Sequence, residues 1–208
     1  MVTKTIGIVL YPDFEELDAV GPYEAFGALR MASGQEWQVV TIARTPGKVR
    51  GFNGLEVEAT YGFDDAPTLD VILLPGGLGS RDAMKDPATL DFVRRSGETC
   101  QYVTSVCTGA LILHAAGFLK GRRATTYWGT IDLLRSLGDV EVVDDERYVH
   151  DGNVITSAGV SAGIDMSLYL VSLLKDADTA KAVQKMMEYY PKPPSFDEVK
   201  ANAAEATA

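Results

Sequence analysis

Cysteine 107 is the residue whose chemical type and position most clearly predict catalysis. An apolar, β-branched run over residues 102–106 leads directly into Cys107, and a helix-prone segment begins at once with Thr108 and Gly109. An abrupt strand-to-helix turn places its residue in a strained backbone conformation with the side chain exposed. The helix N-terminus favours a thiolate, so we expect the thiol pKa to lie below its ordinary value of about 8.5. The alternative is that Cys107 is a small buried apolar residue.

A carboxylate in the first loop is the candidate acid or base for this thiol. Residues 11–22 read YPDFEELDAVGP, and Asp18 lies between Leu17 and an apolar stretch. We therefore expect the Asp18 side chain to point into partly buried space; a capping role is the alternative. A carboxyl group beside a thiol cannot easily carry a second full charge, so the pair should share a proton. Such a pair combines a nucleophilic sulfur with an acid.

Histidine is not expected to act as the base. The sequence contains two histidines, His114 and His150. His114 lies seven residues beyond Cys107 in the same expected helix, about 10 Å along its axis, which is too far for direct proton transfer. His150 stands beside a turn and is expected to be a solvated hairpin residue. Without a cluster of Cys and His residues, we expect no metal site and no cofactor.

A second motif, G-x-S-x-G at 159–163, has the pattern of a serine nucleophile elbow. That arrangement places its acid and its histidine after the serine, whereas both histidines here precede Ser161. We therefore interpret this segment as a glycine-rich turn with Ser161 as a helix N-cap. Gly77-Leu78-Gly79 lacks the third glycine of a dinucleotide-binding fingerprint.

Strand-like and helix-like segments alternate along the chain. We expect strands at 5–11, 37–43, 70–74 and 102–106; hairpins at 48–60 and 140–158; and helices at 15–31, 87–97, 109–119, 130–137, 164–174 and 177–190. This order predicts an α/β, flavodoxin-like three-layer sandwich: a mostly parallel sheet with helices on both faces. Chemistry in such folds occurs beyond the C-terminal ends of the strands, here the loops at 12–18, 75–79, 107–109 and 157–163. We expect one domain over 1–195 and a tail over 196–208.

Charge and composition exclude several classes of function. The 208 residues include 19 basic and 29 acidic side chains, for a net charge of −10. A polyanion repels phosphate backbones and anionic lipids, so neither nucleic acid nor a membrane is an expected partner. If 101–107 is extended, the Cα atoms of Cys100 and Cys107 lie over ~20 Å apart, too far for a disulfide. Two free thiols indicate a reducing compartment, most simply the cytoplasm.

Four stretches carry a resemblance to the ThiJ/PfpI superfamily. They are residues 11–22, DVILLPGG (70–77), YVTSVCTGALILHAAGFLKGRRATTYW (102–128) and DGNVITSAGVSAGIDMSL (151–168). Within that superfamily the chain is most similar to isocyanide hydratases and to the N-terminal domains of AraC-type regulators. A regulator would also have a C-terminal helix-turn-helix domain of about a hundred residues; the sequence stops at Ala208, so DNA binding is not expected.

The resemblance implies a homodimer acting on a small-molecule substrate. It assigns Cys107 as the nucleophile, Asp18 as the acid/base and Thr108 as its active-site neighbour. It places Gly76 and Gly77 where family members present backbone N–H groups to the substrate.

Two residue choices favour the isocyanide hydratase branch. Thr108 stands where protease-like and many glyoxalase-like members have histidine, and Asp18 where the glyoxalase and redox-chaperone branches carry glutamate. The implied reaction converts an isocyanide to an N-substituted formamide through a Cys107 thioimidate. Tyr127 departs from the histidine expected in hydratases and should alter the pocket. The alternatives are a thiol-based redox or stress sensor with chaperone-like action, and a glyoxalase-type hydratase of 2-oxoaldehydes.

Overall fold

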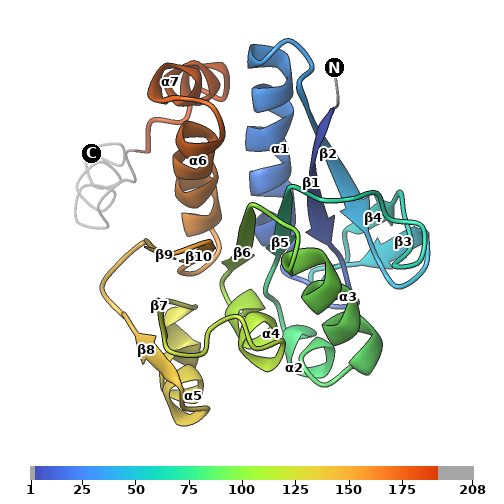
Figure 1. Cartoon of the computed structure of the whole chain (residues 1–208), viewed down its shortest axis with the longest axis vertical. Helices are drawn as coiled ribbons and strands as arrows, with labels where there is room; N and C mark the ends of the chain where they lie inside the picture. Colours follow the sequence, from blue (N-terminus) through green and yellow to red (C-terminus); the bar gives the residue numbers. More distant parts are fainter. Residues whose placement is uncertain (1–2, 192–208) are drawn as a thin grey trace, which may run out of the picture.

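A six-stranded sheet forms the centre of the protein, described here for residues 3–191 by a computed structural model (Figure 1). The strands run in the order β2-β1-β5-β6-β10-β9. Their bounds are β1 Lys4–Val9, β2 Trp37–Ile42, β5 Val71–Leu74, β6 Tyr102–Val106, β9 Tyr148–Asp151 and β10 Val154–Ser157. All neighbours are parallel except β9, which pairs antiparallel with β10. The order of the five parallel strands is that of flavodoxin-like folds, so the predicted fold class is confirmed.

Helices cover both faces of this sheet. On one face, α1 (Glu16–Ala32), α6 (Ala162–Leu174) and α7 (Ala177–Met186) pack against one another. On the other, α3 (Pro87–Gly97) and α4 (Gly109–Ala115) contact β5 and β6. The shorter helical segments are α2 (Ser80–Ala83), η1 (Trp128–Thr130) and α5 (Ile131–Ser136). The result is the expected three-layer sandwich.

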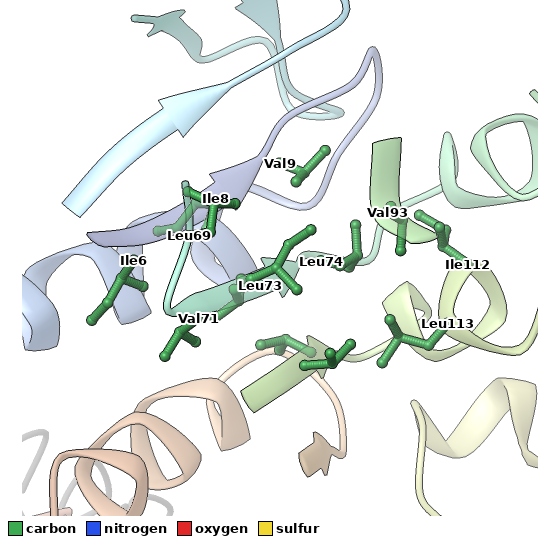
Figure 2. Close-up of a cluster of buried hydrophobic side chains, with 14 of the residues drawn as sticks. Ile6, Ile8, Val9, Leu69, Val71, Leu73, Leu74, Val93, Ile112 and Leu113 are labelled. Atoms are coloured by element: carbon green, nitrogen blue, oxygen red, sulfur yellow. The ribbon is translucent and has the colours of Figure 1, made fainter. Parts of the chain in front are cut away.

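The core lies on both faces of β1 and β5, which explains why these strands are continuous apolar runs. Figure 2 shows Ile6 and Ile8 of β1 along β5, where Leu73 pairs with Ile8, and Val93 of α3 and Ile112 of α4 farther along the same core. All five side chains are fully buried. Burial on this scale fixes the ends of the central strands, and the loops that follow them carry the candidate site.

The expected hairpin over 140–158 is only partly correct. Only β9 and β10 form it, whereas β8 (Val140–Val142) pairs in parallel with β7 (Arg122–Ala124) in a separate small sheet. The acidic stretch between β8 and β9 interrupts the strand, and its Asp144 forms an ion pair with Arg135. The hairpin predicted at 48–60 is confirmed as β3 (Gly47–Arg50) with β4 (Glu56–Ala59).

Two helices end earlier than expected. The helix predicted to run to 119 stops at Ala115, because Gly117 adopts a φ of +92°. Helix α7 stops at Met186, and Glu188 follows with a φ of +48°. The predicted tail over 196–208 lies outside the described residues. Within residues 3–191, none of the helices combines the length and the hydropathy needed to span a lipid bilayer.

Candidate active site

The loops after β1, β5 and β6 meet at one end of the sheet. Strands β1 and β5 are neighbours whose connections leave in different directions, and ligands bind at such switch points in this class of fold. Backbone hydrogen bonds join the first two loops: the Glu15 N–H donates to Gly76 O at 2.9 Å, and the Gly79 N–H donates to Asp13 O at 3.1 Å. Cys107 follows β6 directly. The fold therefore brings together the loops that carry Asp18, Gly76 and Cys107.

Cys107 occupies a strained elbow. Its φ is +55°, a left-handed conformation that is uncommon for a residue with a side chain. Its amide donates to the carbonyl oxygens of Ser157 and Ala158, both at 3.1 Å, and its own carbonyl accepts from Thr126 Oγ1 at 2.8 Å. The predicted strain is thus confirmed, and residues at the end of β10 and after β7 hold the elbow in place. The predicted exposure is wrong, because Cys107 is only 5% exposed.

Asp18 lies in the first turn of α1 and is fully buried. Its Oδ2 accepts a hydrogen bond from the Gly76 N–H at 2.8 Å, and the carboxyl group also interacts with the Cys107 thiol. Within residues 3–191, Asp18 Oδ1 has no hydrogen-bond partner. A buried carboxylate oxygen without such a partner is costly, and its side chain does not cap the helix, so the alternative of a capping aspartate is wrong.

Burial shifts the pKa values of both groups upward. Desolvation raises the pKa of Asp18 to about 7, and the charge of Glu15 adds to it, while the Gly76 amide and Cys107 oppose it. Desolvation and then the Asp18 charge raise the pKa of the Cys107 thiol to about 12. The expectation of a lowered thiol pKa is therefore wrong: burial outweighs the amides that favour the thiolate. The two groups together retain at least one proton across neutral pH.

The glycines after β5 connect the carboxyl group to Thr108. The Gly77 N–H donates to Thr108 Oγ1 at 2.9 Å, and Ser80 Oγ donates to the same oxygen at 2.9 Å. A Cβ on Gly76 would lie 2.5 Å from Thr108 N and 2.9 Å from Asp18 Oδ2, so only glycine allows this approach. The Gly76 and Gly77 amides thus hold Asp18 and Thr108, which the sequence did not indicate.

Tyr11 is a member of the site that sequence reasoning missed. Its hydroxyl donates to the carbonyl oxygens of Pro75 and, at 3.0 Å, of Gly76. Burial raises its pKa well above the ordinary value, and the charges of Asp18 and Cys107 raise it further, so the phenol keeps its proton. The available signal was its place at the C-terminal end of the first strand, where this fold class positions functional side chains.

Comparison with known families decides the assignment. The DJ-1/PfpI family matches residues 4–173. This chain belongs to the DJ-1/PfpI family. It is 45% identical over 192 residues to isonitrile hydratase of Pseudomonas putida, covering 92% of this chain and 81% of that protein.

Two further comparisons bear on the predicted resemblance. A ThiJ/PfpI family protein from Pseudomonas syringae superposes with a TM-score of 0.86 at 38% identity, covering 94% of this chain and 79% of that one. An HTH-type transcriptional regulator of Pseudomonas aeruginosa is 24% identical over 89% of this chain but is covered over only 51% of its own length. The superfamily resemblance predicted from the sequence is confirmed.

In this DJ-1/PfpI chain the G-x-S-x-G segment contributes to the candidate site through its backbone. The Val160 N–H interacts with the Cys107 sulfur, and Val160 has a φ of +43°, which is rare for a β-branched residue. Ser161 precedes α6 as expected, but its side chain caps nothing; its hydroxyl accepts from Arg147 Nη2 at 3.3 Å. The serine is therefore neither a nucleophile paired with histidine nor a side-chain cap.

Neither histidine forms a hydrogen bond with Cys107 or Asp18; both have other partners. His114 Nε2 lies 3.0 Å from Gly138 O. His150 lies between Tyr169 Oη at 2.9 Å and Gly152 O at 2.8 Å, half-buried among aromatic rings, so the expectation of a solvated residue is wrong. In the part of the chain that the structure describes, no three Cys, His, Asp or Glu side chains gather as metal ligands would.

Tyr11 also lines a cavity of about 620 Å³. Its lining includes Arg44, Lys48, Arg50 and Phe63, but neither Cys107 nor Asp18. The candidate site is therefore described by the buried thiol–carboxyl pair, and this cavity is separate from it.

Proposed function

We propose that this protein is an isonitrile (isocyanide) hydratase, which adds water to R–N≡C and releases an N-substituted formamide. The observation that carries the proposal is the 45% identity to isonitrile hydratase over 92% of the chain. The burial of Cys107 against Asp18, without histidine, supports it. Hydration is redox-neutral and needs only proton transfers that Asp18 can perform, so we propose no cofactor.

In the first step, the Cys107 sulfur attacks the terminal carbon of the isocyanide. The S–H bond breaks as the C–S bond forms, and Asp18 accepts the proton and delivers it to the same carbon. The product is a covalent thioimidate, Cys107–S–CH=N–R. A carboxyl group with a pKa of about 7 suits this transfer, because it can accept and donate a proton near neutral pH.

In the second step, water attacks the thioimidate carbon. Asp18 takes a proton from the water and returns it to the substrate nitrogen, which gives Cys107–S–CH(OH)–NH–R. The C–S bond then breaks, the hydroxyl proton returns to sulfur and R–NH–CHO leaves. Covalent catalysis thereby divides one difficult addition into two easier steps.

The neighbouring residues have positioning roles in this scheme. The Gly76 amide fixes Asp18 Oδ2, which leaves Oδ1 for the proton transfers. The amides of Thr108 and Val160 favour negative charge on sulfur during attack. Gly77 and Ser80 hold the Thr108 side chain. Free thiols at Cys100 and Cys107 support a reducing compartment such as the cytoplasm.

We also propose that the protein is a homodimer. Leu17 and Val20 of α1 are each 40% exposed, and Phe52 and Leu55 at the tip of the β3–β4 hairpin are each 50% exposed. Glu16 accepts hydrogen bonds from Asn53, which places the hairpin tip against the start of α1. Such grouped apolar side chains are typical of interfaces. A single mass equal to two chains in light scattering is expected, and a monomer at micromolar concentration would contradict the dimer.

Steady-state turnover of an isocyanide, with the formamide quantified, tests the activity. We expect formamide from wild type, none above the uncatalysed rate from Cys107→Ala, and near-normal turnover from the matched control Cys100→Ala. Equal inertness of wild type and Cys107→Ala would refute the hydratase assignment. Lactate formation from methylglyoxal by such an inert wild type would support the glyoxalase-type alternative, whereas selective oxidation of Cys107 without turnover would support the thiol sensor.

A further inference from the structure

The segment after β7 is fixed against the Cys107 elbow. Thr126 Oγ1 donates to the Cys107 carbonyl at 2.8 Å, and the Thr125 amide donates to Thr156 Oγ1 at 2.8 Å. Both Thr125 and Thr126 are only 1% exposed. The two residues that follow, Tyr127 and Trp128, therefore leave the elbow from a rigid and buried anchor.

The Tyr127 ring packs against the segment that approaches the Cys107 sulfur. A Cβ on Gly159 would lie 2.5 Å from Tyr127 Cδ2, and one on Gly129 would lie 3.0 Å from Tyr127 Cε1, so the ring fits between two glycine backbones. Val160, whose N–H interacts with the Cys107 sulfur, directly follows Gly159. Tyr127 thus follows a residue that hydrogen-bonds to the Cys107 carbonyl and packs against the glycine that precedes Val160.

Trp128 extends this aromatic surface outward. Its ring centroid lies 5.3 Å from that of Tyr127, with the planes tilted by 51°. Trp128 is 79% exposed, more than any other large apolar side chain in residues 3–191. An indole so exposed leaves most of its apolar surface in water, which is costly unless a ligand or a partner covers it.

We propose that Tyr127 and Trp128 form the recognition surface for the R group and give the enzyme a preference for aryl isocyanides. This inference rests on the proposed function. The C–N≡C unit is linear, so when its terminal carbon meets the Cys107 sulfur, the R group lies beyond the nitrogen, away from that sulfur. Tyr127 follows the residue that contacts the elbow and Trp128 reaches solvent, so the proposal places the R group along these two rings. Offset or edge-to-face packing then binds an aromatic ring more tightly than a saturated ring of equal size.

Phenyl isocyanide and cyclohexyl isocyanide provide a matched pair of substrates. For Trp128→Ala, we expect kcat/KM for the phenyl substrate to fall by about 3- to 10-fold more than for the cyclohexyl substrate, mainly through KM. Trp128→Phe is the matched variant and should keep most of the preference. Because the Trp128 side chain is exposed, we expect both variants to fold as the wild-type protein does. Equal losses for both substrates, or no loss, would overturn the inference.

Binding to the inactive protein separates this inference from the proposed function. N-phenylformamide and N-cyclohexylformamide are titrated calorimetrically into Cys107→Ala with and without Trp128→Ala. We expect the second substitution to weaken phenylformamide binding about 3- to 10-fold more than cyclohexylformamide binding. If the wild-type protein lacks turnover but phenylformamide binding is selectively weakened, the hydratase assignment is rejected and the aromatic binding site is retained. No selective weakening, or a changed oligomeric mass with Trp128→Ala, would reject the aromatic site even if the hydratase assignment holds.

Discussion

Replacing Asp18 by asparagine should stabilise the folded protein at alkaline pH while impairing its chemistry. The carboxyl group is fully buried, and its pKa is raised from 3.8 to about 7. Between these two values the folded state retains a proton that the unfolded chain releases. Stability therefore falls as pH rises from 4 to 7 and levels off above the folded pKa.

The size of this loss of stability follows from how far the pKa of Asp18 is raised. About three pKa units at 1.36 kcal/mol each give a loss of about 4 kcal/mol by pH 8, and less than about 1 kcal/mol near pH 4. The amide of the Asp18→Asn variant does not titrate, and its side-chain oxygen can still accept from Gly76. The advantage of Asp18→Asn over wild type should thus grow from near zero at pH 4 to a few kcal/mol at pH 8.

Urea unfolding of both proteins at pH 5, 6, 7 and 8 measures this difference directly. The difference between the two proteins isolates Asp18 from other titrating groups. Glu16→Gln is the matched control in the same helical turn, because hydrogen bonds lower the pKa of Glu16 and its removal should bring no gain at high pH. A difference between Asp18→Asn and wild type that stays constant from pH 5 to pH 8 would refute the argument that burial costs the ionised form.

Three further predictions concern activity. Asp18→Asn should lower turnover by at least ~100-fold, the scale of general acid/base catalysis, and unchanged formamide production would remove Asp18 from the mechanism. Below an apparent pKa near 7, kcat/KM should fall about tenfold per pH unit, because the doubly protonated pair lacks a base; a flat profile from pH 5 to pH 8 would contradict this. Tyr11→Phe should cost about 1–2 kcal/mol of unfolding free energy, since the Pro75 carbonyl oxygen loses its donor and the Gly76 carbonyl oxygen keeps only the Glu15 amide, and should lower kcat by displacing Gly76; wild-type kcat and stability would exclude Tyr11 from the site.

The central strands and the elbow could be predicted because their signals are local. A parallel strand buried on both faces must be a continuous apolar run, and residues 70–74 and 102–106 meet that requirement. Cys107 stands where such a run meets a helix start, so its positive φ followed from the order of residues. The position of Asp18 beside it followed from the rule that strand ends share one edge of the sheet.

The errors have non-local causes. The thiol pKa was expected to fall because the helix start was considered alone, whereas burial of Cys107 in the folded chain raises it, and the Val160 amide, more than fifty residues away in sequence, offsets that rise only in part. The pairing of β8 with β7 leaves no local signal, because it joins segments about eighteen residues apart. The roles of the Gly76 and Gly77 amides likewise depend on acceptors, Asp18 and Thr108, that only the folded chain brings close.

The central claim is that the Cys107 sulfur bonds to the substrate carbon. Rapid-quench mass spectrometry of the intact protein during isocyanide turnover, followed by peptide mapping, tests it most directly. We predict a mass gain equal to one substrate molecule, located on Cys107 and absent from Cys100 when the chain is cleaved between them, for example after Tyr102. Formamide production by the Cys107→Ala variant at the wild-type rate, or a substrate adduct on Cys100 alone, would contradict the claim.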